Sequence, residues 1–499
     1  MDLLTNLAIG FEAALSPWNL FYCFVGALFG TLIGVLPGLG PVATISMLLP
    51  LTFGLDPTAA LIMLAGIFYG AQYGGSTTAI LINLPGESSS VVTALDGHQL
   101  ARQGKAGVAL ATAALASFLA GTIATVVIAL FAPPLAKIAV GFTAVEYFSL
   151  MILGLLASIL LANGSVLMAI GMALTGLLLG LVGADVNSGV QRFTFGELNL
   201  ADGLDFVVVA MGLFAVAEVV RNLESPEDRE VMVAKVKGLM PSRRELRQML
   251  PPALRGTALG SILGILPGGG AILASFGSYV LEKRLSRHPE TFGAGAIEGV
   301  AGPEAANNAG AQTSFIPMLT LGIPSNPVMA LMIGAMVIQG IQPGPSVMVE
   351  QPALFWGIIV SMWVGNLFLV LLNLPLIGIW VSMLRVPYRH IFPVIVFFSA
   401  VGVFSIGNSV FDIWMLAAFG LIGYGLIKLG GEPAPLLLGF ILGEMVEEYF
   451  RRAMLISRGD ATVFLTRPLS AAFLLMALIL VLMIALPALR RKREDAFEE

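Results

Sequence analysis

Charged residues are scarce in this chain, and their scarcity excludes an ordinary soluble fold. Only 11% of the 499 residues are Asp, Glu, Lys or Arg, whereas 57% are apolar. A soluble domain carries roughly 25% charged residues, which cover its surface. About a dozen apolar stretches approach the roughly 20 residues that a helix needs to cross a bilayer, and one of them runs over 354–384. The composition predicts an all-α polytopic membrane protein with about 12 transmembrane helices plus re-entrant hairpins.

Cysteine and histidine are almost absent, which argues against several kinds of enzyme. The one cysteine, Cys23, lies in an apolar stretch, so disulfides and thiolate metal sites are excluded. The three histidines, His98, His288 and His390, lie in basic loops, so an intramembrane serine protease would lack its base. No pair of intramembrane aspartates occurs, and a metal site would have too few ligands. We therefore expect no enzyme, no catalytic residues, no metal and no cofactor beyond a coupling ion.

Charge also divides the chain. The longest charged stretch, 222–252, is predicted as a cytoplasmic linker between a first membrane half, 1–221, and a second, 253–428. Residues 429–499 are expected to form further membrane helices and a basic tail.

Basic residues orient the halves. No Lys or Arg precedes Arg102, no removable signal peptide is recognisable, and the later loops are rich in basic residues. The N-terminus is therefore expected outside and the basic loops in the cytoplasm. Arg451, Arg452, Arg458 and Arg467 contradict this pattern, because simple alternation places their loop outside. Basic residues in short loops also give no sign of nucleic-acid binding.

Two segments repeat at an offset of 230 residues. Residues 30–40 (GTLIGVLPGLG) and 260–270 (GSILGILPGGG) share six of eleven positions. A looser match aligns 75–78 with 310–314, and 84–86 with 323–325, with four residues added. Because both pairs occur in the same order, we interpret them as a duplication.

The Pro-Gly segments predict hairpins that turn inside the membrane. In the second copy, two apolar pieces of about 11 residues flank the tip, and each would span about 16 Å as helix, roughly half of the bilayer core. Basic residues flank this copy and not the first, so the halves are expected to be inverted repeats, an architecture common in transporters. The alternative is that both segments are ordinary spans kinked at Pro-Gly.

The motifs are similar to those of the TctA family, the large membrane subunit of bacterial tripartite tricarboxylate transporters. The resemblance covers about residues 10–450 and rests on several motifs in order, namely 34–41 (GVLPGLGP), 69–79 (YGAQYGGSTTA), 83–87 (NLPGE), 96–97 (DG) and 264–270 (GILPGGG).

The resemblance implies partners and a substrate class that composition does not reveal. It implies a small membrane subunit like TctB, a periplasmic substrate-binding protein like TctC, and uptake of citrate or related carboxylates. It also implies coupling to a Na⁺ or H⁺ gradient, without ATP hydrolysis, in the bacterial inner membrane. Stand-alone carboxylate carriers and channels remain the alternatives, since Gly-Pro loops also form channel filters.

Neutral donors are expected to bind the substrate, because no Lys or Arg is centred in a clear span. Helix N-termini freed at the Pro-Gly tips carry partial positive charge and free N–H groups, which suit an anion. Small hydroxyl and amide residues near the breaks complete the set, although such residues also pack between membrane helices. The candidates are Pro37, Gly38, Gly40, Ser76, Thr77, Thr78, Asn83, Pro267, Gly268, Gly269, Gly270, Asn307, Asn308, Gln312, Thr313, Ser314, Ser325 and Asn326.

Acidic residues at membrane depth are the candidates for the coupling ion. Glu298 and Glu304 lie in a Gly- and Ala-rich stretch, 293–310, which is either membrane-embedded or a cytoplasmic loop. A charge at a helix centre costs about 2.5–3.5 kcal/mol on insertion scales, so an embedded carboxylate implies a function. Glu87 and Asp96 follow the first polar cluster, where Asp96 and Gly97 are expected to form a turn.

Overall fold

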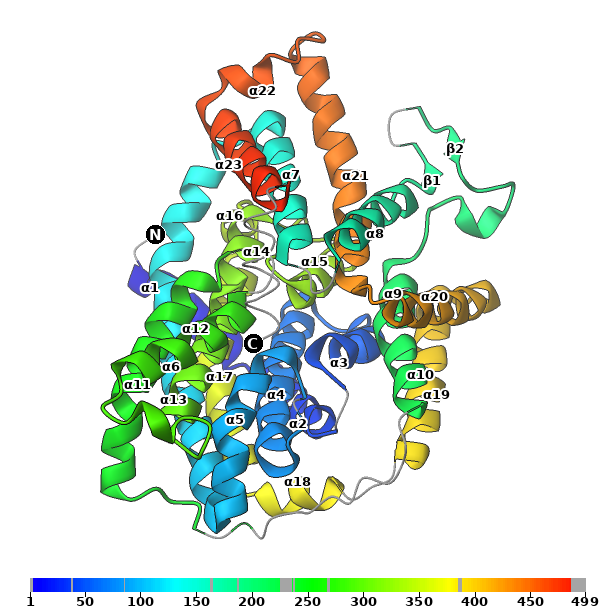
Figure 1. Ribbon diagram of the computed structural model, residues 1–499. Coiled ribbons are helices and arrows are strands. Elements are labelled where there is room, and N and C mark those ends of the chain that lie inside the picture. The colour runs from blue at the N-terminus through cyan, green and yellow to red at the C-terminus, as the bar shows by residue number, and fades with distance from the viewer. Residues whose placement is uncertain are drawn as a thin grey trace.

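The structure is a computed structural model that describes residues 3–36, 39–84, 86–161, 165–185, 188–224, 236, 238–266, 270–384 and 388–485. These residues are mainly helical (Figure 1). The described strands are β1 (Gly183–Ala184) and β2 (Gln191–Arg192), which pair antiparallel. The prediction of an all-α membrane fold is therefore confirmed in its coarse form.

The helices follow the chain in three groups. Before the charged stretch they are α1 (Leu3–Ala14), α2 (Pro17–Gly34), α3 (Pro41–Leu48), α4 (Pro57–Ile82), α5 (Val91–Leu100), α6 (Ala106–Ala139), α7 (Ala144–Leu161), α8 (Val166–Leu179), α9 (Phe206–Ala210) and α10 (Ala217–Leu223). After it they are α11 (Arg243–Leu263), α12 (Gly270–Leu285), α13 (Glu298–Thr313), α14 (Phe315–Leu321), α15 (Pro327–Ile338), α16 (Val347–Glu350), α17 (Pro352–Asn373), α18 (Ile377–Met383), α19 (Tyr388–Gly407) and α20 (Val410–Lys428). The last group is α21 (Pro433–Ile456), α22 (Val463–Thr466) and α23 (Pro468–Ala485).

Shorter turns of helix connect several of these. The 3₁₀ turns are η1 (Leu49–Thr52), η2 (Ser88–Ser90), η4 (Leu198–Leu200) and η6 (Pro289–Thr291). The π turns are η3 (Ala101–Lys105) and η5 (Met211–Val216).

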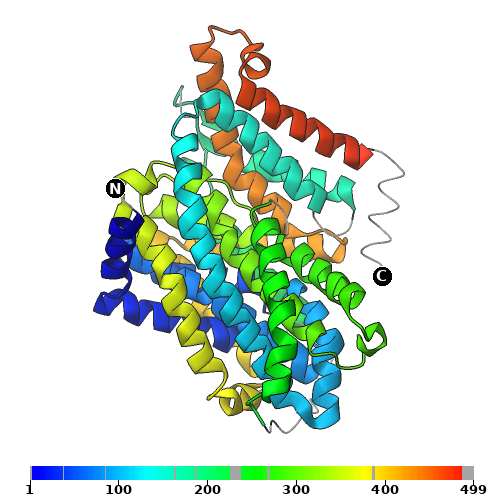
Figure 2. The same ribbon diagram turned by 90° about the vertical axis from the view of Figure 1, so that its left-hand side faces the viewer.

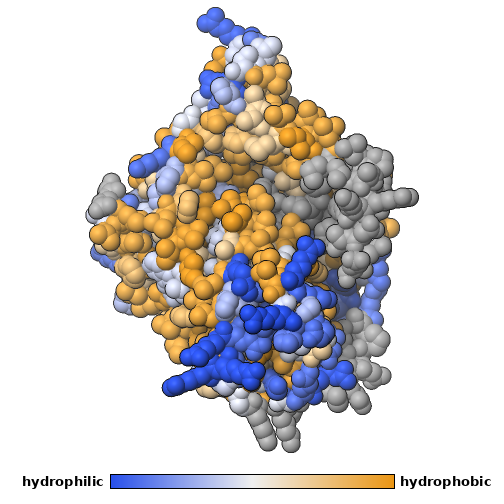
Figure 3. All heavy atoms as spheres, turned by 60° about the vertical axis from the view of Figure 1, so that its left-hand side comes forward, coloured by the Kyte–Doolittle hydropathy of each residue, from blue (hydrophilic) through white to orange (hydrophobic). Residues whose placement is uncertain are grey.

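On the face that Figure 3 shows, apolar side chains form a broad belt, a large group of hydrophilic side chains lies below it, and a smaller group lies at the top. Five described helical segments are long and apolar enough to cross a membrane, and seven shorter apolar helices accompany them. The long segments are Pro17–Gly34, Ser88–Ala139, Phe206–Leu223, Pro352–Asn373 and Val410–Lys428. The chain is therefore a multi-pass membrane protein by composition and helix length, while the figure of about 12 spans stays a prediction.

Helices α4 and α13 form the centre of the molecule. Residues 59–81 of α4 and 299–313 of α13 are buried along their whole length. Helix α6 packs against α13, α11 and α17 (Figure 2). Because α4 and α13 are buried on every face, polar side chains on these two helices are removed from lipid and must be satisfied by other protein groups.

Each half has a row of glycines, here called a glycine ladder, where one helix packs closely against the central helix. In the first half α2 packs against α4, and in the second half α11 packs against α13. In the first half, a Cβ on Gly30 of α2 would lie 2.3 Å from the carbonyl oxygen of Ile67 on α4. In the second half, a Cβ on Gly260 of α11 would lie 2.2 Å from that of Ala306 on α13. Glycine permits this approach because it has no side chain, as in other membrane helix pairs. The same contact recurs one turn before and one turn after, in the pairs Gly26–Met63, Gly34–Ala71, Gly256–Gly302 and Gly264–Gly310.

The two ladders fix how the halves correspond. The glycines of α2 correspond to those of α11 at an offset of 230, and their contact residues on α4 correspond to those on α13 at an offset of 239. The helix ends agree, since Asn83 after α4 and Gly322 after α14 both adopt left-handed backbone, with φ of 55° and 70°. The predicted alignment of 75–78 with 310–314 is therefore wrong. The nine added residues lie between α12 and α13, and the central helices match without insertion.

The hairpin arms of the second half are longer than expected. Helices α11 and α12 have 21 and 16 residues, where two pieces of about 11 were predicted. The apolar pieces are there, but α11 starts early, at Arg243 within the range predicted as linker, where Ser242 and Glu245 form a capping box. At its other end α12 continues through Lys283 and Arg284. The charged turns lengthen both helices beyond the apolar part.

The arginines that contradict the charge pattern are mostly ion-paired. Arg451 contacts Asp185 at 2.9 Å, and Arg467 contacts Glu146 at 3.4 Å. Arg452 pairs with Glu448 one turn earlier in α21. The end of α21 and helix α22, beside which these arginines occur in the chain, lie at the end of the molecule opposite the start of α11 (Figure 1). Local carboxylates therefore accompany basic residues at that end.

Candidate functional site

Glu304 lies at the centre of a buried polar cluster that both halves build. It is on α13, and only 1% of its surface is exposed. Its Oε2 accepts a hydrogen bond from Ser76 Oγ of α4 at 3.0 Å, and its Oε1 accepts one from Thr93 Oγ1 of α5 at 2.5 Å. Ser117 Oγ of α6 donates to Oε2 at 3.3 Å. Three hydroxyls from three helices thus surround one carboxylate, as a buried charge requires.

The next polar residues on α13 extend the cluster toward the break after α4. Asn307 Nδ2 donates to Glu87 Oε1 at 2.8 Å, and Ser89 Oγ donates to the same oxygen at 2.7 Å. Gln72 Nε2 of α4 lies 3.5 Å from Asn307 Oδ1. Two carboxylates, Glu87 and Glu304, therefore belong to one network of amides and hydroxyls, and that chemistry favours a cation.

A polar seam continues along α13 and α6. Asn308 Nδ2 donates to Ser117 Oγ at 2.7 Å, and two turns from Glu304 Thr125 Oγ1 donates to Gln312 Oε1 at 2.9 Å. Because Glu304, Asn308 and Gln312 recur every four residues, they share one face of α13. The seam therefore follows the contact between the two helices.

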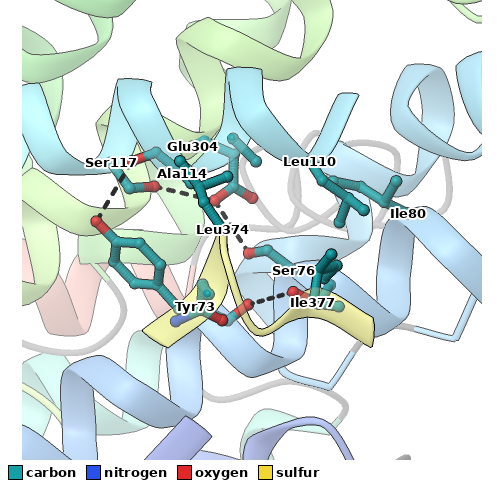
Figure 4. Close-up of a pocket in the computed structure, with 12 residues that line it drawn as sticks. Tyr73, Ser76, Ile80, Leu110, Ala114, Ser117, Glu304, Leu374 and Ile377 are labelled. Carbon is teal, nitrogen blue, oxygen red and sulfur yellow. Dashed lines mark hydrogen bonds between the residues drawn. The ribbon is translucent and has the colours of Figure 1, made fainter. Parts of the chain in front are cut away.

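A small cavity opens beside the carboxylate (Figure 4). It has about 20 Å³, more than the roughly 10–15 Å³ that one water molecule needs. Its polar lining comes from α4, α6 and α13 and from the end of α17. The lining residues are Tyr73, Ser76, Thr77, Ile80, Leu110, Ala113, Ala114, Ser117, Glu304, Asn373, Leu374 and Ile377.

The loop before α13 is held by the first half. Asp96 of α5 is fully buried, and its Oδ1 accepts hydrogen bonds from the backbone N–H groups of Gly293, Gly295 and Ala296, each at 2.8 Å. The expected turn at Asp96 and Gly97 is wrong, since both lie within helix α5. The carboxylate instead anchors the segment that leads into the Glu304 helix.

The duplication relates the polar cluster to a second place in the molecule, and the residues compared there are aromatic. At the offset of 239, the equivalents of Asn307, Asn308 and Ser76 are Phe68, Tyr69 and Phe315. These three rings pack together, with centroid distances of 5.7–6.5 Å. The duplication therefore repeats the backbone packing, whereas one polar site and one aromatic cluster occupy equivalent places.

The structure brings a subset of the predicted residues together. Ser76, Thr77, Glu304, Asn307 and Asn308 meet around the carboxylate, and Gln312 lies further along the seam. Within the stretch 293–310, α13 is buried in the protein from Gly299 onward, while 293–297 form the loop before it, and the membrane depth of the stretch stays a prediction.

Other predicted residues lie outside the cluster. The hydroxyls of Thr78, Thr313, Ser314 and Ser325 bond to backbone carbonyls, at distances of 2.6–3.5 Å. Asn83 and Asn326 flank helix ends, Gly40 precedes α3, and Gly270 begins α12. Glu298 is half-buried and accepts from Gln248 Nε2 at 2.8 Å. Pro37, Gly38, Pro267, Gly268 and Gly269 lie outside the described residues.

Several site residues escaped the sequence analysis. Thr93 follows the 83–87 motif by six residues and Ser117 lies further along the chain, and both join the site through tertiary contacts with Glu304. Asn373 was counted within one apolar segment, 354–384, but helix α17 ends at this residue and α18 starts at Ile377. The proline at position 375 was the available signal, because proline interrupts a helix.

The comparisons agree with this architecture. The model of the family described as "Tripartite tricarboxylate transporter TctA family" matches residues 20–438. The chain belongs to the TctA family. The expected resemblance is confirmed, and membership of this transporter family fits the central polar site on α13.

Two relatives from Agrobacterium vitis are similar to this TctA protein. "Uncharacterized 52.8 kDa protein in TAR-I ttuC' 3'region" is 62% identical over 499 residues, which cover 100% of this chain and 99% of the relative. "Uncharacterized protein in TAR-II ttuC' 3'region" is 62% identical over 240 residues, or 48% of this chain and 99% of the relative. No solved structure matches the chain.

Proposed function

We propose that this chain is the large transmembrane subunit of a tripartite uptake system for tricarboxylates such as citrate or related carboxylates. A Na⁺ or H⁺ gradient drives uptake, a periplasmic binding protein delivers the substrate, and a small membrane subunit completes the complex in the bacterial inner membrane. Family membership over residues 20–438 supports this assignment. The observation that carries the ion coupling is the fully enclosed Glu304 carboxylate with its three hydroxyl donors.

The halves work as inverted repeats in this proposal. In Figure 1, α5 lies in the lower part of the molecule, whereas α15, which follows the equivalent helix end, lies above it near the middle. Inverted halves that meet at mid-membrane are a recurrent architecture for alternating access. Helices α4 and α13 would then be the central pair around which access alternates.

Neutral groups hold the carboxylate substrate. Every Lys and Arg whose burial the structure describes is at least partly exposed, whereas the buried charged side chains among the same residues are all acidic. Amide nitrogens and helix N-termini are therefore the donors available to a substrate anion in the described core. The acidic cluster repels an anion, so substrate and coupling ion bind at different places or reach the site as a neutral pair.

A transport assay in intact cells tests the proposal. Labelled citrate and a panel of dicarboxylates are offered to cells that make this chain alone, or with the small subunit and the binding protein encoded beside it. Uptake should need all three proteins, survive ATP depletion and stop when ionophores collapse the ion gradients. Uptake by this chain alone favours a stand-alone carrier, and flux that ignores the gradient favours a channel.

A further inference from the structure

The cavity beside Glu304 contains a buried acceptor that the surrounding protein does not satisfy. Asn373 is 4% exposed, and its Oδ1 accepts no hydrogen bond from any residue that the structure describes. Its Nδ2 donates to Leu369 O at 2.9 Å, which fixes the amide on the last turn of α17. An unsatisfied buried oxygen destabilises the protein, so its position on the cavity wall calls for a positive partner or a donor.

The C-terminal end of α17 also favours a cation in the cavity. Helix α17 ends at Asn373, and Leu374 and Ile377 beyond the break also line the cavity. The C-terminus of a helix carries a partial negative charge, and broken helices use this end to coordinate cations in transporters. Figure 4 shows the interrupted α17–α18 ribbon beside the carboxylate of Glu304.

The lining of the cavity is a set of oxygens. Glu304 supplies a carboxylate, Ser76, Thr77 and Ser117 supply hydroxyls, and Asn373 supplies an amide oxygen. All 12 described lining residues are neutral except Glu304, so nothing on the wall balances its charge. We propose that this cavity binds one dehydrated monovalent metal cation, with Na⁺ as the physiological ion, and that Asn373 is one of its ligands.

Other occupants fit less well. A divalent ion would leave an unbalanced positive charge, and Mg²⁺ would also need space for its retained waters. A transition metal prefers His, Cys and several carboxylates, and the described residues contain no group of three such ligands. A proton on Glu304 would neutralise the carboxylate but would leave Asn373 Oδ1 without a partner. A metal cation in the cavity can contact both oxygens.

This inference rests on the proposed function but is tested by binding. The full-length chain, purified in detergent, is titrated with NaCl against choline chloride, and ²²Na⁺ binding is counted. The expected result is saturable binding of one Na⁺ per chain. Asn373→Leu should weaken it by at least about tenfold, the scale on which metal sites respond to lost support. Asn373→Asp keeps an oxygen ligand and should retain binding. Ser361→Ala, on the same helix but bonded only to its own backbone, is the matched control.

The possible outcomes distinguish failure of the cation site from failure of the proposed transport function. Absence of saturable Na⁺ binding to the wild-type chain, or wild-type affinity in Asn373→Leu, overturns the cation site. Carboxylate uptake that follows a pH gradient and ignores Na⁺ also overturns it, while transport stands. Na⁺ binding that depends on Asn373 without carboxylate uptake supports the site and overturns the proposed function. If Asn373→Leu does not fold, loss of Na⁺-dependent thermal stabilisation in the cavity variant Thr77→Val provides the test, and an unchanged stabilisation overturns the site.

Discussion

Ser76 Oγ donates to Glu304 Oε2 across 3.0 Å, although 228 residues separate the two in the chain. Ser76 belongs to the central helix of the first half, and Glu304 belongs to that of the second. The hydrogen bond therefore joins the halves at the most buried carboxylate of the cluster. A rearrangement of one half against the other would change the donors of Glu304, which is how a coupling ion could sense the state of the transporter.

Removing single hydroxyl donors should weaken the response to the coupling ion. We expect Ser76→Ala and Ser117→Ala each to raise the ion concentration for half-maximal uptake by about tenfold, since a hydrogen bond to a charged group is worth about 1.5–3 kcal/mol. Uptake at saturating ion should change less. Thr122→Val is the control, because the hydroxyl of this threonine on α6 donates to Phe118 O within its own helix. Equal ion dependence in all variants would contradict the assigned role of the hydroxyls.

The glycine ladders should be intolerant of side chains. Gly260→Val would place a Cβ 2.2 Å from Ala306 O, so the helices α11 and α13 must separate. Overpacking of this kind costs about 1–3 kcal/mol, and we expect a lower midpoint of thermal unfolding for the purified protein. Gly171→Val has open space around the new Cβ and should unfold like the wild type. A Gly260→Val protein as stable as the wild type would refute the close contact.

Asp96 should hold the loop before α13. In Asp96→Ala, three backbone N–H groups at residues 293, 295 and 296 lose their acceptor, and the buried one at Ala296 alone costs about 1–3 kcal/mol when it is left unsatisfied. We expect faster hydrogen exchange of these amides and a lower unfolding midpoint. The exposed Asp202→Ala is the comparison variant. Unchanged exchange at 293–296 would show that the loop is held by other contacts.

The β1–β2 segment should depend on a buried aspartate. Asp185 is 5% exposed and faces Arg192 at 3.3 Å and Arg451 at 2.9 Å. In Asp185→Asn, charge-assisted bonds worth about 1.5–3 kcal/mol are lost, so trypsin should cleave after Arg192 roughly tenfold faster. Glu197→Gln, in an exposed turn of the same segment, should digest at the wild-type rate. Equal rates for both variants would mean that this ion network does not anchor the segment.

Features set by composition and local repetition could be predicted from the sequence. The low charge implied membrane helices, and the Pro-Gly repeat implied a duplication at an offset of 230. Motif position also pointed to Ser76, Asn307 and Glu304, because each lies in a polar stretch beside an apolar one. These signals are local, so they survive without knowledge of the contacts.

The alignment that was wrong and the site residues that were missed both depend on packing between helices that are distant in the chain. The register of the central helices was only partly visible in the sequence. The match of 84–86 with 323–325 has the offset of 239 that the glycine contacts give, whereas the match of 75–78 with 310–314 suggested another offset. Ser117 is one of four hydroxyl residues in the Ala-rich helix α6, and Asn373 is one of two asparagines in the apolar segment 354–384, so each resembled an ordinary packing residue. Only the approach of α6, α13 and α17 places them beside one carboxylate.

The central claim is that Glu304 couples an ion gradient to carboxylate uptake, and reconstitution tests it most directly. The complete three-part system is assembled in liposomes, and labelled citrate uptake is followed under an imposed Na⁺ gradient, with Glu304→Gln and the half-buried Glu298→Gln compared with the wild type. We predict that Glu304→Gln inserts normally but loses gradient-driven uptake, while Glu298→Gln retains most of it. Gradient-driven uptake at the wild-type rate in Glu304→Gln would contradict the account.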